Sequence, residues 1–470
     1  MSLDKALAHV RDGADTVIET SCATVILKGD KAYKLKKSVD YGFLDFTTPE
    51  KRREALRREL QFNQRTAADI YHHVEEVYGE TVLVMRRFDH KAVLSALADT
   101  APDDGLMRDL GYEIAQFHAS SDICTDVNHL NNIKYVIDSN TQNISKFRHV
   151  LGAEAVDAYE AAVTSAYLKV ADSVEKRFRD GFVRHCHGDL HLGNILIEHN
   201  RPVLFDCIEF NDRLSQIDVL YDLAFLLMDV SVRGHRAAAS QVLNVWLAQS
   251  ARHADDPQAI YAGLSLLPLY MSMRAAVRCH VNANYGGEAG YGLGRARDYL
   301  KAALGFLDDQ PPQLMAIGGL SGAGKSTRAR VEAPRIGSAC GAVILRSDEI
   351  RKRLWGCDEY APLPEAAYAP ADDVRVYSHM FDLAQTLLAS GQSVILDATF
   401  RQSALRQRCA DLAQTVHVPF QGLWLDVPAH ERQLRIAARR KDVSDATPDI
   451  ALKQQGIDLS DISWHIEQVK

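Results

Sequence analysis

The stretch HGDLHLGNILIEHNRPVLFD, residues 187–206, places Asp189, Asn194 and Asp206 at defined spacings. Asn194 follows Asp189 by five residues, and Asp206 follows Asn194 by twelve residues, directly after the apolar run PVLF. Mg²⁺ prefers oxygen ligands. Two carboxylates and an amide in this order could hold one or two Mg²⁺ ions against a triphosphate, and Asp189 could accept the proton of an attacking hydroxyl.

Three histidines share this region and raise the alternative of a zinc site. His185 stands just before the stretch, and His187 and His191 stand within it. Zinc would need the three rings to converge on one point, but His191 lies beyond a glycine. No Cys or acid other than Asp189 is adjacent at a familiar ligand spacing. We therefore predict that the histidines are loop framework, that His187 bonds to backbone, and that Asp189 is a general base.

The N-terminal segment predicts a nucleotide-binding lysine and its partner. Residues 15–37 are predicted to form strands, and Lys34 lies near the end of the last of these strands, in AYKLKK. A helix is predicted to begin near Thr48 and to carry Glu59 on an otherwise apolar face. A buried acid requires a partner. Lys34 is the best candidate, and Lys36 is a competitor because it shares the strand face.

Residues 15–305 resemble the aminoglycoside phosphotransferase family of kinase-like enzymes. HGDLHLGNIL is similar to that family's catalytic loop almost letter for letter, and FDCIEF takes the place of its metal-binding segment. IDVLYDLAFLL, with Asp218 and Asp222, resembles the helix that follows. The resemblance implies an α+β bilobal kinase-like domain at 1–308, with a small β-rich lobe over about 1–88 and a large helical lobe over about 89–308.

The same resemblance implies the cofactors and the roles of single residues. ATP would be the phosphoryl donor and Mg²⁺ the metal. Asp189 would be the catalytic base, Lys34 and Glu59 would serve the nucleotide, and Asn194 and Asp206 would bind the metal. One departure from protein kinases is the lack of G-x-G-x-x-G near the N-terminus. TSCATV, around residues 20–23, would cover the phosphates instead.

The pattern of apolar residues changes after DDQPPQ, residues 308–313, where two acids precede two prolines. Beyond it, the apolar runs QLMAIGG, AVILRS, SVILDAT and FQGLWLDV alternate with helix-length segments, which predicts a parallel α/β domain at 313–470. GGLSGAGKST follows the first run and satisfies G-x-x-x-x-G-K-[ST]. Its backbone amides and side chains are predicted to bind nucleotide phosphates through Gly319, Ser321, Gly322, Ala323, Gly324, Lys325, Ser326 and Thr327.

Acids and arginines around this loop suggest a kinase. Asp348 follows the second run and could accept a hydroxyl proton, although a helix N-cap is the alternative. Asp397 ends a buried run and could join Ser326 at Mg²⁺, or serve a turn. Arg439 and Lys325 could stabilise the transferred charge; a solvated basic face is the other explanation for the arginines near it, Arg435 and Arg440. Arg351 could bind an anionic group.

The C-terminal segment, residues 313–450, resembles small P-loop kinases that phosphorylate metabolites or polynucleotide ends. The whole chain resembles the bifunctional aminoglycoside phosphotransferase/ATP-binding proteins. We expect a phosphotransferase with two nucleotide-binding domains, each acting on a hydroxyl of a small molecule. The alternatives are an ATP-binding regulatory protein with a silent kinase-like domain, and a polynucleotide 5′-hydroxyl kinase.

Two further candidate site residues are Arg274 and Arg278, spaced i,i+4 in YMSMRAAVRCHVNANY. Ion pairing inside the domain is the simpler expectation for them, and binding of an anionic part of the substrate is the alternative. The spacing itself predicts that both lie on one face of a helix.

Composition limits the partners. The net charge of −8 and pI near 6.1 give no reason to expect nucleic acid. The N-terminus has no signal-peptide core, and the longest apolar run, LSLLPLYMSM, is too short to cross a bilayer. Eight cysteines are scattered without a CxxC pair. We expect a cytoplasmic protein without a membrane partner.

Overall fold

The computed structural model describes residues 2–42, 44–97, 102–285, 291–439, 442–454 and 461–469. The chain forms two compact units. Unit 1 comprises residues 1–233 and 270–303, and unit 2 comprises 234–269 and 304–470. The structure thus groups 234–269, which precede the predicted domain boundary, with the C-terminal half of the chain.

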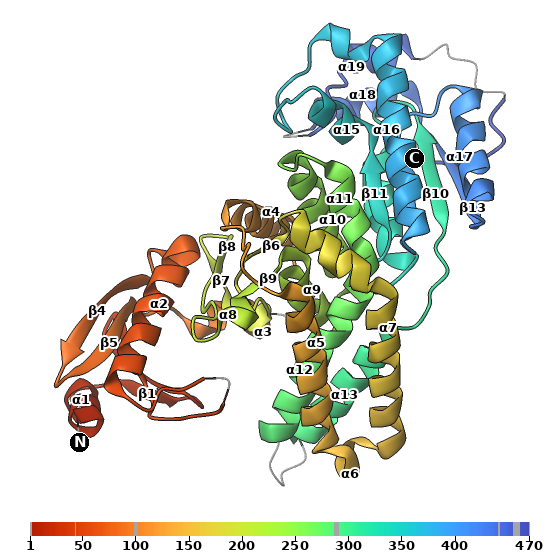
Figure 1. Cartoon of the computed structure of the whole chain (residues 1–470). Coiled ribbons are helices and arrows are strands. Elements are labelled where there is room, and N and C mark those ends of the chain that lie inside the picture. The colour runs from red at the N-terminus through yellow and green to blue at the C-terminus, as the bar shows by residue number, and fades with distance from the viewer. Residues whose placement is uncertain are drawn as a thin grey trace. The chain divides into compact units, whose positions relative to one another are not determined.

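The small lobe of unit 1 is an antiparallel five-stranded sheet in the order β1-β2-β3-β5-β4. Its strands are β1 (Thr16–Glu19), β2 (Ala23–Lys28), β3 (Lys31–Lys36), β4 (Tyr71–Val77) and β5 (Glu80–Arg86). Helix α1 (Ser2–Arg11) contacts β5, and α2 (Pro49–Ala67) packs on β4 and β5, as Figure 1 shows. Thr48 caps α2 by accepting a hydrogen bond from Lys51 N, which confirms the predicted helix start.

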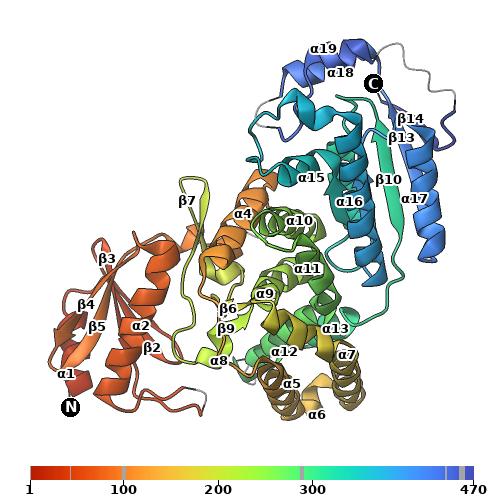
Figure 2. The ribbon, with the colours of Figure 1, turned by 45° about the horizontal axis from the view of Figure 1, so that its top comes forward.

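The large lobe of unit 1 is mainly helical (Figure 2). Its short strands pair as β6 with β9 and β7 with β8. These strands are β6 (Val183–His185), β7 (Ile195–Glu198), β8 (Arg201–Leu204) and β9 (Gln216–Asp218). The helices are α3 (Leu94–Leu97), α4 (Asp104–Ser120), α5 (His129–Ser145), α6 (Arg148–Leu151), α7 (Ala153–Arg179), α8 (Asp212–Ser215), α9 (Val219–Val232), α12 (Leu267–Tyr285) and α13 (Tyr291–Gly305).

Among the residues that the structure describes, one apolar helical segment, 257–284, is long enough and apolar enough to cross a membrane. Its most apolar window is 78% buried inside the protein, which is also the pattern of a core helix.

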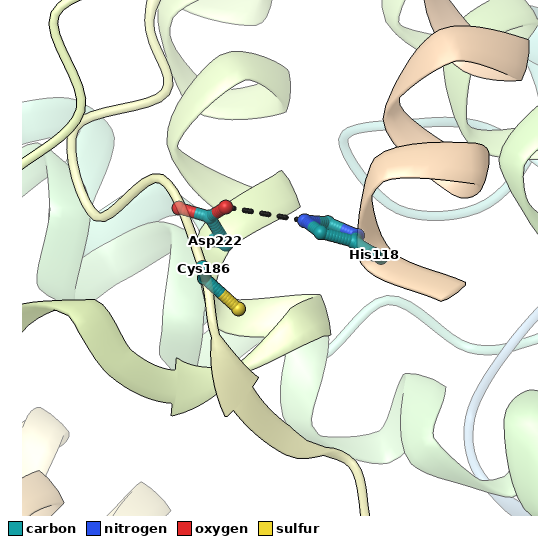
Figure 3. A group of neighbouring side chains, drawn as sticks. All are labelled: His118, Cys186 and Asp222. Carbon is teal, nitrogen blue, oxygen red and sulfur yellow. Dashed lines mark hydrogen bonds and ion pairs between the residues drawn. The ribbon is translucent and has the colours of Figure 1, made fainter. Parts of the chain in front are cut away.

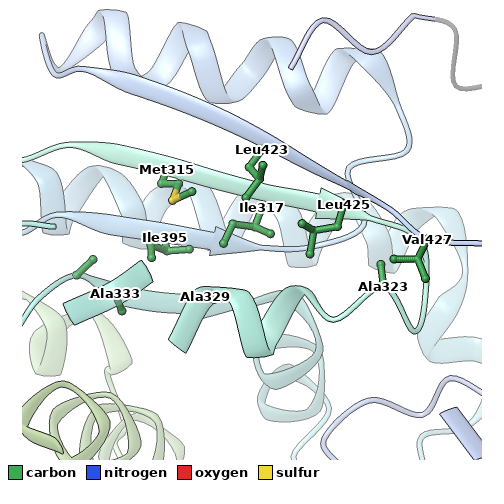
Figure 4. Close-up of a cluster of buried hydrophobic side chains, with 10 residues drawn as sticks. Met315, Ile317, Ala323, Ala329, Ala333, Ile395, Leu423, Leu425 and Val427 are labelled. Carbon is green, nitrogen blue, oxygen red and sulfur yellow. The ribbon is translucent and has the colours of Figure 1, made fainter. Parts of the chain in front are cut away.

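Unit 2 has a five-stranded sheet of parallel strands in the order β11-β12-β10-β13-β14. The strands are β10 (Leu314–Gly319), β11 (Val343–Arg346), β12 (Val394–Asp397), β13 (Phe420–Asp426) and β14 (His465–Gln468). The helices are α10 (Arg236–Arg252), α11 (Pro257–Ala262), α14 (Lys325–Glu332), α15 (Ser347–Leu354), α16 (Pro370–Ala389), α17 (Ser403–Thr415), α18 (Ala429–Ala437) and α19 (Pro448–Lys453). Figure 4 shows buried Ile317, Ile395 and Leu425 packed between these strands and α14. Together with the bilobal unit 1, this α/β sheet confirms the predicted fold classes.

Helix α10 makes side-chain bonds to the edge strand β11 of unit 2 and to the segment that precedes this strand. Asn244 accepts a hydrogen bond from Ile344 N at 2.7 Å and donates one to Ala342 O at 3.2 Å. Arg236 donates to the carbonyls of Gly337 and Ser338 at 2.7 and 2.6 Å. The side chain of Asn244 therefore satisfies an amide and a carbonyl at the free edge of the sheet.

Replacing Asn244 with Ala is expected to destabilise unit 2 by about 1–3 kcal/mol, because two partly buried backbone groups lose their partner. All four tryptophans, at positions 246, 355, 424 and 464, belong to unit 2. Urea unfolding followed by tryptophan fluorescence therefore measures this unit. The exposed Gln414→Ala in the same unit is the control, and equal midpoints for the two variants would contradict the bracing role of Asn244.

Candidate functional site

The loop that carries Asp189 is held by a buried carboxylate in the first turn of α9. Asp222 accepts hydrogen bonds from His187 N at 3.1 Å and Gly188 N at 2.8 Å. Its Oδ2 also lies 3.1 Å from His118 Nε2 of α4. Figure 3 shows this pair beside Cys186. Burial tends to raise the pKa of Asp222, but the bond to His118, together with the charges of His118, His187 and Arg274, outweighs it and lowers that pKa.

His118, Cys186 and Asp222 place their ligand atoms within 4.8 Å of one another, close enough in principle for a metal ion. However, both oxygens of Asp222 are already engaged, one by Gly188 N and the other by His187 N and His118. The Cys186 thiol donates to Ile217 O at 3.3 Å. The group is therefore better described as the anchor of the loop than as a metal centre.

Asp189 and Asn194 meet as their spacing predicted. The Asn194 amide donates to Asp189 O at 2.9 Å and to Asp189 Oδ2 at 3.0 Å. The side chain of Asp189 is 37% exposed, so a hydroxyl compound can reach it, and its Oδ2 lies 3.4 Å from His191 Nε2. Burial tends to raise the pKa of Asp189, but nearby His191, His187 and Arg274 outweigh it and hold that pKa below its usual range.

The histidines of the loop have different partners, as expected of framework residues. His187 is fully buried, and its Nε2 lies 2.9 Å from Phe205 O. His191 Nδ1 accepts a hydrogen bond from Gly193 N at 2.9 Å. The ring of His185 packs edge-on against Phe62, with 4.2 Å between the ring centres.

Asp206 is placed next to Asn194 by the hairpin of β7 and β8. Phe205 N donates to Asn194 O at 3.0 Å, and Asp206 follows with a positive φ of 62°. Its side chain is 44% exposed, and its Oδ1 lies 3.0 Å from Lys34 Nζ. The structure thus brings Asp206, Asn194 and Asp189 to one end of this hairpin, with Lys34 opposite.

Glu59 of α2 has both of the lysine partners considered from the sequence. Its Oε1 lies 2.6 Å from Lys34 Nζ, and its Oε2 lies 2.7 Å from Lys36 Nζ. Burial tends to raise the pKa of Glu59, but the two ammonium groups lower it to about 2. The pairing of Lys36 with Glu209 at 2.6 Å was not predicted. Burial raises the pKa of Glu209.

The glycine-rich loop follows β10 and turns into α14 at Lys325. Gly322 has φ +84°, and a Cβ there would lie 2.7 Å from Arg432 O. Gly324 has φ +89° at the N-cap of α14. Ala323 is buried in the core, Ser326 and Thr327 lie in the first turn of α14, and Ser321 N donates to Gln454 Oε1 at 3.0 Å.

Lys325 lies among the charged residues predicted to act with it. Its Nζ donates to Leu320 O at 3.2 Å, which folds the side chain back over the loop. Burial lowers the pKa of Lys325, whereas Asp397 and Asp348 oppose this effect and Arg439 adds to it. Asp397, Asp348 and Arg439 are therefore all within electrostatic reach of the ammonium group.

Arg346, which the sequence did not single out, links the acids around the loop. Its Nε lies 3.3 Å from Asp397 Oδ2 and its Nη1 lies 3.0 Å from Glu349 Oε1. Asp397 is 4% exposed, and within the part of the chain that the structure describes its Oδ2 accepts no hydrogen bond. A buried carboxylate oxygen of this kind has the chemistry of a divalent-cation ligand, and Asp397 interacts electrostatically with Lys325 of the glycine-rich loop. Asp442 lies 3.3 Å from Arg439 Nε.

Two of the alternatives for this site are settled by contacts. Asp348 does not cap α15, because the N-cap is Arg346 and no side chain makes a capping bond there. Arg351 is not available for an anion: its Nη2 pairs with Asp373 at 2.6 Å and its Nη1 donates to Ala367 O. Arg440 lies outside the described residues.

Comparison with known proteins matches both halves of the chain. A model of the phosphotransferase enzyme family matches residues 40–258, and an AAA domain model matches 314–456. Uncharacterized proteins of Mycobacterium tuberculosis and Mycobacterium bovis are 31% identical, over 93% of this chain and 88% of theirs.

Solved structures show a weaker likeness. One is the GDP and kanamycin complex of APH(2")-IIia, with 12% identity and a TM-score of 0.39, over 62% of this chain and 93% of that one. Another is the Mycobacterium tuberculosis APS kinase CysC in complex with AMPPNP and APS, with 19% identity and a TM-score of 0.23, over 27% of this chain and 70% of that one.

Proposed function

Since the chain belongs to the bifunctional aminoglycoside phosphotransferase/ATP-binding protein family, we propose that both of its domains are ATP-dependent kinases. Each would transfer the γ-phosphoryl group of ATP to a hydroxyl of a small molecule. The domains would be 1–308 and 313–470, and the protein would act in the cytoplasm. The family models support phosphotransfer from a nucleotide; the choice of ATP and of a hydroxyl acceptor is our proposal.

The observation that carries the proposal for the first domain is the Lys34–Glu59 pair facing Asp206. A partly buried lysine held at 2.6 Å by a buried helical acid is positioned for nucleotide phosphates. Asn194 and Asp206 would hold Mg²⁺, which when bound neutralises charge on the phosphates. Asp189 would take the proton of the acceptor hydroxyl. The hydroxyl oxygen then bonds to the γ-phosphorus, the bond to the bridging oxygen breaks, and ADP leaves.

The second domain would use the glycine-rich loop. The loop amides and Lys325 would bind the β and γ phosphates at the start of α14. Ser326 and Asp397 would hold Mg²⁺. Asp348 would accept the hydroxyl proton, and Arg439 would supply a cation to the transferred group. The clustering of Asp348, Asp397 and Arg439 around Lys325 supports these roles.

Replacing Lys325 with Ala is expected to lower turnover by the second domain about 10²–10³-fold, because a cation at the transferred phosphoryl group is lost. ADP release would be measured with a panel of hydroxylated metabolites and aminoglycosides. The exposed Arg408→Ala of the same unit is the control. Acceptors still used by Lys325→Ala but not by Asp189→Asn would belong to the first domain.

The same panel separates the proposal from its alternatives. If neither variant changes any ATP-dependent activity, the two-kinase proposal fails. If only Lys325→Ala matters, the kinase-like domain is a binding module. Labelling of 5′-hydroxyl RNA that is lost in Lys325→Ala would favour the polynucleotide kinase instead.

A further inference from the structure

Two arginines of α12 lie one helical turn apart in unit 1, on one face of the helix. Arg274 is 5% exposed, and Arg278 is half-buried. Ion pairing inside the domain was the simpler expectation, and it is wrong for the residues that the structure describes. Within those ranges, neither guanidinium has a carboxylate at ion-pairing distance.

This lack of a counter-ion is unusual in unit 1. Among its described residues, the other two arginines less than one-tenth exposed each bind a carboxylate through two nitrogens. Arg52 donates to Glu80 at 2.9 and 2.7 Å. Arg177 donates to Asp218 at 2.5 and 2.7 Å. Arg274 is equally buried without such a partner, although an uncompensated buried charge is costly.

The contacts of Arg274 hold its guanidinium without neutralising it. Its Nε donates to Tyr221 O at 3.2 Å. Its central carbon lies 3.8 Å from the ring centre of Tyr221 and 4.7 Å from that of Phe225. Its Nη2 is buried without a hydrogen-bond partner. Aromatic faces attract a cation but leave its net charge and its remaining N–H groups unsatisfied.

Arg278 also lies against an aromatic ring and, among the described residues, has a buried nitrogen without a hydrogen-bond partner. Its central carbon lies 5.8 Å from the ring centre of Tyr299, and its Nε is buried without a hydrogen-bond partner. The hydroxyl of Tyr299 donates to Asp229 at 3.4 Å. Asp229 also accepts a hydrogen bond from Leu192 N at 3.2 Å, so this carboxylate serves the Asp189 loop.

A short series of contacts connects Arg274 to the catalytic loop. Asp189 Oδ2 lies 3.4 Å from His191 Nε2. The His191 ring packs on Phe225 with 5.3 Å between centres, and Phe225 in turn contacts Arg274. Arg274 therefore lies close to the carboxylate that would receive the acceptor hydroxyl, without contacting it. Arg278 interacts electrostatically with the same carboxylate.

We infer that Arg274 and Arg278 bind an oxyanion of the phosphoryl acceptor, a carboxylate or a phosphate group, while a hydroxyl of the same molecule lies at Asp189. The inference rests on the proposed function of the first domain. Guanidinium groups match the geometry of carboxylate and phosphate oxygens. An anion between the two arginines would supply a counter-charge in direct contact, which Asp189 and Asp229 supply only from a longer distance. A cationic acceptor would instead meet two like charges.

The first test is binding of inorganic phosphate to the full-length Lys325→Ala protein, in which the glycine-rich loop is disabled. Isothermal titration is expected to show that Arg278→Gln weakens binding at least about tenfold, as the loss of a charge-assisted contact should. Arg274→Lys should retain more affinity than Arg274→Gln. Arg179→Gln, an exposed change of equal charge in unit 1, should bind like its parent. No phosphate binding, or equal binding by Arg278→Gln, would overturn the inference.

The second test is turnover, again in Lys325→Ala, with glycerate and glycerol 3-phosphate as anionic acceptors and glycerol and choline as neutral and cationic ones. Only the anionic compounds should be phosphorylated. Arg278→Gln should raise KM for the acceptor at least about tenfold and change KM for ATP less than about twofold. A rise in KM for ATP alone would assign the arginines to the nucleotide and overturn the inference.

The outcomes separate this inference from the proposed function. One outcome is that glycerol or choline is phosphorylated, that Asp189→Asn abolishes this turnover, and that the arginine variants leave it unchanged. This outcome would overturn the oxyanion inference and support the kinase role of the first domain. The opposite outcome is that phosphate binding depends on Arg278 but Asp189→Asn does not affect turnover. This outcome would support the oxyanion site and rule out the kinase role of the first domain.

Discussion

Replacing Asp189 with Asn is expected to lower turnover by the kinase-like domain about 10³-fold, within the range of about 10²–10⁴ that a positioned general base contributes. The amide has the shape of the carboxylate but cannot accept the hydroxyl proton. Asp189 is suited to this role because it is 37% exposed and oriented by Asn194 at 3.0 Å.

The measurement is the initial rate of ADP release in the Lys325→Ala protein, so that the second domain does not contribute. Asp172→Asn, at an exposed position on α7, removes one carboxylate of unit 1 away from the loop and is the control. KM for ATP should stay nearly unchanged, because Asp189 does not contact Lys34. A rate within about threefold of the parent would show that Asp189 is not the base.

Replacing Glu59 with Gln is expected to cost about 3–5 kcal/mol of the stability of unit 1, the range for removing one partner of a buried ion pair. The carboxylate is fully buried and contacts Lys34 at 2.6 Å and Lys36 at 2.7 Å. The amide would leave two buried ammonium groups with less counter-charge. Lys36 would keep its ion pair with Glu209, and Lys34 would keep its ion pair with the partly exposed Asp206.

Amide hydrogen exchange of β3 and α2 peptides measures this loss locally, because the tryptophans report on unit 2. Glu54→Gln, exposed on the same helix, is the control. Equal protection in the two variants would contradict the role of Glu59. Nucleotide affinity should fall together with protection, since Lys34 loses the acid that orients it.

Glu59 also predicts the acid sensitivity of unit 1. Its pKa is lowered from 4.5 to about 2 by the two lysines. A carboxylate with a lowered folded-state pKa stabilises the protein above about pH 4.5 and loses that contribution as the pH falls toward about 2. The shift corresponds to about 3 kcal/mol. The stability difference between wild type and Glu59→Gln should therefore narrow over this pH range, and a constant difference would contradict it.

Much of both candidate sites could be predicted from the sequence, because their residues stand close together in the chain. The spacing of Asp189 and Asn194 needs only one loop, and the glycine-rich loop needs only one strand and one helix. The acid of α2 could be predicted because an acid on an apolar helix face must find a cation. The structure supplied Lys36 as a second partner, where the sequence had left a choice.

The strands β4 and β14 were not predicted for a different reason. Their sequences, YHHVEEV and HIEQ, are polar, and both strands lie at sheet edges. Edge strands bury few side chains, so no apolar alternation marks them. Pairing with β5 and β13, respectively, makes these segments strands.

The two fold classes, the family and the local loops could be predicted from the sequence, because apolar periodicity and short motifs act over a few residues. Which charges are satisfied depends instead on the tertiary structure. Lys36 and Glu209 are 173 residues apart in sequence, and Asp222 reaches back 35 residues to His187. The tertiary structure also places Arg274 against aromatic rings and not against an acid. Counter-ions depend on distances across the folded core, and local spacing along the chain does not encode those distances.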